Sequence, residues 1–99
     1  MESSISVDLA SRWTQSPEVL FREVDGEAVL LDLKTEQYHG LNSVGTRIWQ
    51  LLAEDGALST VYARLMDEYD VDGARLQADL LKLVEELAQR GMVLPEEKR

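Results

Sequence analysis

The side chains of this 99-residue chain that could do chemistry are few, and His39 is the only histidine. A catalytic histidine needs a nucleophile or a second proton carrier within reach, and a metal site needs three or four ligands. The carboxylates show no ligand spacing around His39, and no cysteine is present to supply a thiolate or a disulfide. We therefore predict no catalysis, no metal site and no cofactor, and interpret His39 as a structural or surface residue.

The other acidic residues and the glycines give no sign of an enzyme either. Neighbouring carboxylates such as Glu85–Glu86 do not face the same way on a helix, so they are ordinary solvated positions. The spacing of Gly40, Gly45 and Gly56 matches neither the P-loop nor the dinucleotide-binding fingerprint. The sequence thus favours a binding or structural protein over an enzyme.

The charge balance limits the possible partners. Nineteen Asp and Glu residues against ten Lys and Arg residues give a net charge of −9. Nucleic-acid binding relies on cations that neutralise phosphates, so this negative charge repels DNA and RNA. An acidic surface suits a basic or neutral partner or, as the default interpretation, simply keeps the protein in solution. No apolar run approaches the ~20 residues that cross a bilayer. The N-terminal MESSISVDLASRW lacks the basic start and apolar block of a signal peptide, so we expect a cytoplasmic location without membrane contact.

Three segments in the first half of the chain have the composition of β-strands. EVLFREV (18–24) and EAVLLDL (27–33) are rich in branched and aromatic residues, and Asp25-Gly26 between them is a hairpin-turn signal. After the polar turn KTEQ, a third strand is predicted at QYHGL (37–41). Three strands joined by tight turns predict an antiparallel meander.

The period of the apolar residues then changes to that of helices. Asn42 is placed to cap a first helix, EDGALS ends it, and Ser59 is predicted to cap a second. Asp72 is predicted to cap the third and longest helix, over about 73–90, which Gly91 ends as a left-handed C′ residue. The sequence therefore predicts three helices after the strands.

Strands grouped before helices predict an α+β domain with the helices on one face of a three-stranded antiparallel sheet. We expect a single domain over 17–94, because no linker or repeat interrupts it. Residues 1–16 are expected to form a loose arm or an extra short strand, since apolar residues alternate over 5–9. Residues 95–99 are expected to be a charged tail.

The strand predicted over 37–41 comes last in the meander and is expected to lie at the edge of the sheet. Edge strands carry unpaired amides and carbonyls, which proteins usually protect with charge or proline, and Gln37 to Gly40 include neither. An extended peptide could bind there by strand addition, with the third helix as one wall of the groove. The alternatives are an edge that is merely short, or one that residues 1–16 cover.

A winged helix-turn-helix is a second interpretation of two helices separated by a short turn beside a small sheet. A DNA-reading third helix would present cations such as Arg75, Lys82 and Arg90. Asp79 and Glu86 dilute these cations, and the net charge of −9 opposes DNA. We therefore keep the winged-helix-like architecture and treat DNA binding as an alternative function.

The stretch GEAVLLDLKTEQYHGLNSVGTRIWQLL, followed by YDVD and ADLLKLVEELAQRGMV, resembles the PqqD-like proteins. These are small peptide chaperones of pyrroloquinoline quinone biosynthesis and of ribosomally made, post-translationally modified peptides. The resemblance runs from about Ile5 to Leu94, and its most specific part is the spacing LLD…Y…LN…G…IW…LL. The residues that carry this spacing are Leu30, Leu31, Asp32, Tyr38, Leu41, Asn42, Gly45, Ile48, Trp49, Leu51 and Leu52.

The resemblance implies a winged helix-turn-helix-like domain that recognises the leader segment of a precursor peptide. In such proteins the leader adds as a strand to the third strand, in the cleft against the third helix. Carried onto this chain, the peptide-binding main-chain contacts fall on Gln37, Tyr38, His39, Gly40 and Leu41. One edge of the apolar stripe on the third helix is expected to receive leader side chains. The helix residues chosen for this contact are Arg75, Leu76, Asp79, Leu80 and Leu83.

We therefore predict a non-catalytic protein that holds a leader peptide and presents the precursor to a separate protease or modifying enzyme, for example in a lasso-peptide system. Holding raises the effective concentration of the reacting segment near the enzyme. Asp79 is expected to pair with a basic leader residue and Arg75 with an acidic one. The alternatives are a winged-helix DNA-binding protein and a structural subunit whose outer strands pair in a dimer.

Overall fold

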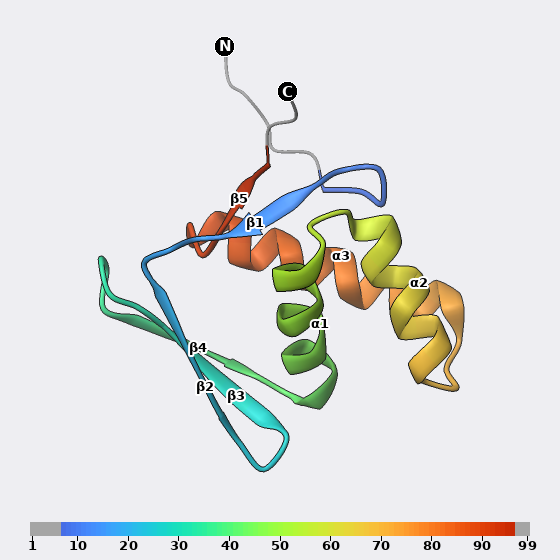
Figure 1. The fold of residues 1–99 in the computed structure, drawn as a ribbon, viewed down its shortest axis with the longest axis horizontal. Helices are drawn as coiled ribbons and strands as arrows, with labels where there is room; N and C mark the ends of the chain where they lie inside the picture. The colour runs from blue at the N-terminus through green and yellow to red at the C-terminus, as the bar shows by residue number, and fades with distance from the viewer. Residues whose placement is uncertain (1–6, 97–99) are drawn as a thin grey trace.

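The computed structural model of the protein describes residues 7–96. Its main sheet contains β2 (Val19–Val24), β3 (Glu27–Asp32) and β4 (Gln37–Leu41), in the order β2-β3-β4 with both pairs antiparallel. The three strands lie in the lower left of Figure 1. The predicted meander is confirmed.

Two tight turns fix the register of this sheet. Asp25 and Gly26 both have positive φ, at 56° and 82°, and form the two-residue hairpin loop between Val24 and Glu27 that the sequence predicts. In the second turn, the buried Asp32 accepts a hydrogen bond through Oδ1 from the amide of Lys34 at 2.9 Å. Local side chains and backbone angles therefore determine where each strand ends.

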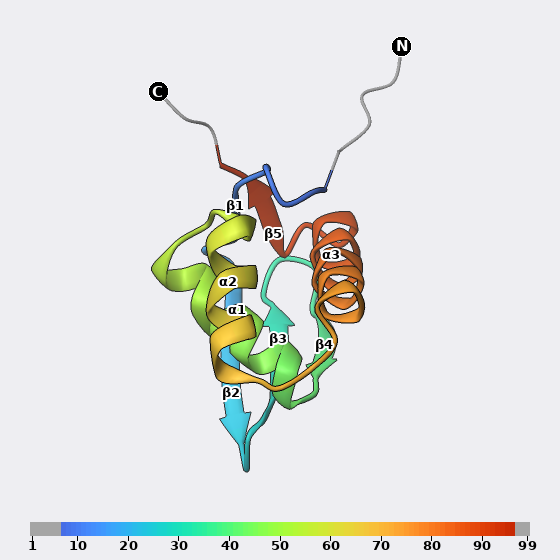
Figure 2. The ribbon, with the colours of Figure 1, turned by 90° about the vertical axis from the view of Figure 1, so that its right-hand side faces the viewer.

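Three helices follow the sheet: α1 (Ser43–Glu54), α2 (Leu58–Glu68) and α3 (Gly73–Gln89). The first helix packs on the sheet and also contacts both other helices, and Figure 2 shows α3 on the same side of the molecule as β4. The order of strands before helices confirms the predicted α+β class. Among residues 7–96, no helix is long and apolar enough to cross a membrane.

The helix ends follow the sequence in most places. Asn42 caps α1 by accepting from the amide of Gly45 at 2.8 Å, and Asp72 caps α3. Gly91 follows α3 with φ +73°, as its C′ role requires. The predicted cap of α2 is wrong, because Ser59 lies inside the helix, which begins at Leu58. Leu58 is completely buried, so its packing starts the helix one residue earlier.

The N-terminal segment is tied to the end of the chain. A short strand, β1 (Trp13–Gln15), pairs antiparallel with β5 (Val93–Pro95) in a separate two-stranded sheet. The alternation predicted over 5–9 gives no strand at residues 7–9, and residues 5 and 6 lie outside the described part. Trp13 is only 2% exposed, so burial of this large side chain places the strand there.

One apolar cluster joins the sheet to the helices. Ala28 and Leu30 face α1 from β3, whereas Val29 between them is exposed. Leu80 and Leu87 of α3 are completely buried in the same cluster. The core therefore fills the space between the inner face of the sheet and the helices, and it holds α3 on the side of the molecule where β4 lies.

Candidate functional site

The outer edge of β4 is unpaired in the described part of the chain. One edge of β4 pairs with β3, and no strand within residues 7–96 lies along the other edge. Strand β1, which the sequence left as a possible cover for this edge, pairs with β5 instead. Within residues 7–96, the backbone groups along this edge are therefore free to pair with an extended guest chain.

The register shows which backbone groups point to this free edge. A two-residue hairpin closes with a hydrogen-bonded pair, here Val24 with Glu27, so the odd-numbered residues of β3 bond to β2. The even-numbered residues of β3 then bond to β4, where Leu30 pairs with His39. The amides and carbonyls of Tyr38 and Gly40 are left pointing away from the sheet, and those of His39 point into it.

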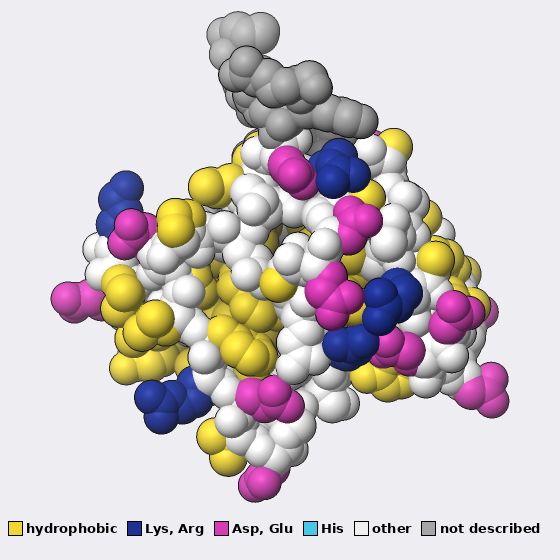
Figure 3. Space-filling view, in the orientation of Figure 1, with side chains coloured by type: hydrophobic (Ala, Val, Ile, Leu, Met, Phe, Trp, Pro, Cys, Tyr) yellow, Lys and Arg dark blue, Asp and Glu magenta, His cyan; other side chains and the backbone are white. Residues whose placement is uncertain are grey.

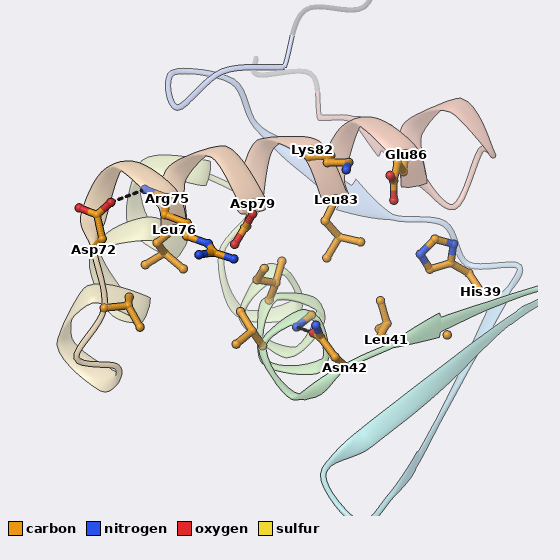
Figure 4. A pocket seen from close by; sticks show the side chains of 15 residues that line it. His39, Leu41, Asn42, Asp72, Arg75, Leu76, Asp79, Lys82, Leu83 and Glu86 are labelled. Carbon is orange, nitrogen blue, oxygen red and sulfur yellow. Dashed lines mark hydrogen bonds between the residues drawn. The ribbon is translucent and has the colours of Figure 1, made fainter.

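A cavity of about 460 Å³ lies between this edge and the helices. Its lining comes from β4 at His39–Leu41, from the start of α1 and from one face of α3. Figure 4 shows the α3 side chains projecting toward β4, with Leu83 above Leu41. We call this cavity, together with the free edge of β4, the β4–α3 groove.

The α3 wall of the groove follows helical geometry. Its lining positions are spaced by three or four residues, so they form one face of the helix. They are Arg75, Leu76, Asp79, Lys82, Leu83 and Glu86. Charged groups alternate in sign along this wall, and the apolar Leu76 and Leu83 lie between them. The wall can therefore receive apolar side chains and also contact charged ones.

The structure brings most of the residues chosen from the sequence to one place. The seven that line the cavity are His39, Gly40, Leu41, Arg75, Leu76, Asp79 and Leu83. Gln37 and Tyr38 do not line it, and Tyr38 projects from the opposite face of the sheet. Leu80 does not line it either, because its side chain is 0% exposed in the core. The face of α3 toward the groove is therefore the one that contains positions 75, 79 and 83.

Several lining residues were not chosen from the sequence. Val44 and Ile48 of α1 form part of the cavity floor, and Lys82 and Glu86 extend the α3 wall. The two α3 residues lie three and seven positions after Asp79, so helical spacing from Asp79 would have identified them. The two α1 residues had no such signal, since their pattern is equally that of core residues.

His39 is the titratable side chain that β4 contributes to the groove. Its pKa is lowered from the usual 6.5, first by burial and then by the positive charge of Arg90, while Glu86 acts in the opposite direction. The neutral imidazole is therefore favoured at neutral pH. In residues 7–96, no group of His, Cys, Asp and Glu side chains is arranged to hold a metal ion.

This fold and groove define a class of small α+β domain in which the outer strand of the main sheet, β4, has an unpaired edge within residues 7–96 and lies beside the third helix. The chain belongs to the PqqD family: the family model of coenzyme PQQ synthesis protein D (PqqD) matches residues 27–93, more than half of its length. The resemblance seen in the sequence is thereby confirmed. A comparison with curated proteins finds no match.

Two solved structures are similar over most of the chain. TbiB1 in complex with the TbiA(beta) leader peptide is 33% identical with a TM-score of 0.76, and the match covers 86% of this chain and 99% of that one. Lasso peptide synthetase B1 complexed with the leader peptide is 30% identical with a TM-score of 0.74, covering 86% and 100%. Both of those proteins bind leader peptides.

Proposed function

We propose that this protein binds the leader segment of a ribosomally made precursor peptide in the β4–α3 groove and performs no catalysis itself. The observation that carries the proposal is the free edge of β4 beside a groove with apolar and charged walls. Membership of the PqqD family and the two similar leader-peptide complexes support the same function.

The leader is expected to add as a fourth strand to the sheet. Its backbone would exchange hydrogen bonds with Tyr38 and Gly40, whose amides and carbonyls point outward in the register described above. Every second leader side chain then faces α3, because side chains alternate across a strand. Apolar leader residues would contact Leu76 and Leu83, and charged ones would contact Arg75 or Asp79.

Strand pairing and the apolar groove wall together can account for the affinity for the leader, and no catalytic step is needed. Backbone hydrogen bonds are the same for every sequence, so selectivity comes from two or three apolar side chains in the groove. A short stretch of strand pairing with such anchors can reach micromolar affinity, about −8 kcal/mol. The groove is therefore sufficient for specific capture of one short segment.

The protein would present the bound precursor to a partner protease or modifying enzyme. Capture of the leader holds the rest of the precursor near the enzyme and raises its local concentration, as a second binding site would. We place this step in the cytoplasm, where ribosomes make the precursor. The similarity to lasso peptide synthetase B1 favours a lasso-peptide pathway.

Titration of leader peptides into the ¹⁵N-labelled protein tests the proposal. The peptides come from the short reading frames beside the gene, and a scrambled peptide of equal composition is the control. We expect saturable shifts of the amide signals of Tyr38 and Gly40 and of the α3 residues that line the groove. Shifts confined to other surfaces would contradict the proposed site, and salt-sensitive binding of duplex DNA in place of peptide would favour the DNA-binding alternative.

A further inference from the structure

The outer face of the main sheet is apolar and exposed. Register places Leu20, Leu31 and Tyr38 in one row across the three strands, with Val29 beside them. Leu20 is 54% exposed, Val29 43% and Tyr38 68%. Figure 3 shows hydrophobic side chains gathered on the sheet side of the molecule. We call the apolar residues Leu20, Val24, Val29, Leu31 and Tyr38 the outer sheet face; Arg22, which pairs with Val29, lies on the same side of the sheet.

Such a face is unusual for a sheet of this kind. In a two-layer antiparallel domain, the face away from the helices normally carries polar side chains. Here the inner face is also apolar, since Ala28, Leu30 and Leu41 fill the core. A shallow hollow of about 990 Å³ runs along the outer face, and Gly40 leaves space beside Val29 because it has no side chain. Contiguous exposed apolar surface generally marks an interaction site.

We propose that the outer sheet face is the docking surface for the enzyme that acts on the captured precursor, an inference that rests on the proposed function. Tyr38 and Gly40 belong both to this face and to the edge where the leader would add. A fourth strand would therefore extend the same face, and its outward side chains would lie next to Tyr38. A protein seated here touches the leader directly.

Charge specifies the chemistry of this partner. The chain carries −9 overall, and the charged residues that line the hollow are the carboxylates Asp25 and Glu27 at one end and a single cation, Arg22. A partner with an apolar centre and basic groups around it is complementary to this surface. A second copy of the chain would bring another −9 to the contact, so like-charge repulsion disfavours it as the occupant.

The test compares partner binding with leader binding in one set of variants. The probe is a purified protease that cuts the precursor captured by this protein, and its affinity is measured by biolayer interferometry with and without leader peptide. The double variant Leu20→Thr with Val29→Thr keeps strand-compatible residues while it removes apolar contact area. Leu94→Thr is the matched control, because Leu94 is also a strand residue and is 42% exposed.

We expect the double variant to bind the protease at least tenfold more weakly, while its affinity for the leader by calorimetry stays within twofold of wild type. The Leu94→Thr control should match wild type in both measurements, and Val24→Thr repeats the test if the double variant unfolds. Unchanged protease affinity would overturn the proposal. So would sedimentation showing a wild-type dimer that the double variant dissociates, because the second copy would then occupy the face. If wild type binds no leader, the proposed function fails, while protease binding to the unloaded protein still tests the docking surface.

Discussion

The outward-facing amide of Gly40 provides a direct test of strand addition. Replacement of Gly40 by proline removes this donor and places a ring where a guest carbonyl would approach. A Cβ at Gly40 meets no atom within 4 Å, and proline is tolerated on an edge strand whose amide faces solvent. We therefore expect Gly40→Pro to fold and to bind the leader poorly.

The magnitude follows from the hydrogen bond that is lost. One backbone hydrogen bond contributes about 0.5–1.5 kcal/mol, and 1.4 kcal/mol corresponds to a tenfold change in affinity. Because the proline ring also prevents close approach of the guest strand, we expect at least the upper end of that range. The dissociation constant of the leader should rise about tenfold or more, and the melting temperature should change by only a few degrees.

His39→Pro is the matched control, one position earlier on the same strand. The amide of His39 points toward β3, where His39 pairs with Leu30. Its loss leaves a buried carbonyl without a donor, which costs about 1–3 kcal/mol of unfolding free energy. Calorimetric titration and thermal unfolding by circular dichroism measure both effects. A folded Gly40→Pro protein with wild-type affinity would refute strand addition at β4, and a stable His39→Pro protein would refute the register.

Four further substitutions test individual residues. Leu80→Ala should lower the unfolding free energy by about 2–5 kcal/mol without changing leader affinity in the folded protein, since Leu80 is in the core; a change in affinity alone would place it in the groove. Asp79→Lys should change leader affinity and leave the melting temperature nearly unaltered, because Asp79 is exposed on the groove wall. Burial lowers the pKa of His39, so the unfolding free energy that depends on its neutral imidazole should be complete above pH 6.5 and decline below it; His39→Gln should flatten this pH profile of stability. Hydrogen bonding to Arg47 lowers the pKa of Glu68 from 4.5, so this ion pair stabilises the wild type above pH 4.5. Urea unfolding should show Glu68→Gln less stable than wild type by about 0.2–1 kcal/mol above pH 4.5, and this difference should disappear as the pH falls below 4.5.

Local signals in the sequence were sufficient for most of the fold. Asp25-Gly26 specifies a two-residue hairpin, and Asn42 and Asp72 provide side-chain oxygens for helix caps, so these boundaries depend on neighbouring residues alone. Ser59 had the same type of signal and was misleading, because burial of Leu58 outweighed a local cap. Where a side chain is buried by distant segments, only the assembled fold decides the boundary.

The orientation of α3 could not be predicted in the same way. Its apolar stripe is wide enough that Leu76, Leu80, Leu83, Val84 and Leu87 all fit a core-facing pattern. The structure divides them: Leu80, Val84 and Leu87 are 0% exposed, Leu83 is half-buried on the groove wall, and Leu76, 5% exposed, belongs to the core and also lines the groove. This division depends on where β4 and α1 lie against the helix, and helical periodicity alone contains no information about it.

Alternate residues of β4 have different roles in leader binding: one pair would determine the affinity and the other the selectivity between leaders. The backbone groups of Tyr38 and Gly40 point to the free edge and their side-chain positions face outward, whereas His39 and Leu41 bond to β3 and line the groove. A guest strand therefore gains its backbone hydrogen bonds from one pair of residues and meets the side chains of the other pair. Substitutions at His39 or Leu41 should change which leader is preferred, while proline at Gly40 should weaken every leader equally. A Gly40→Pro protein that discriminates between leaders differently from wild type would contradict this separation.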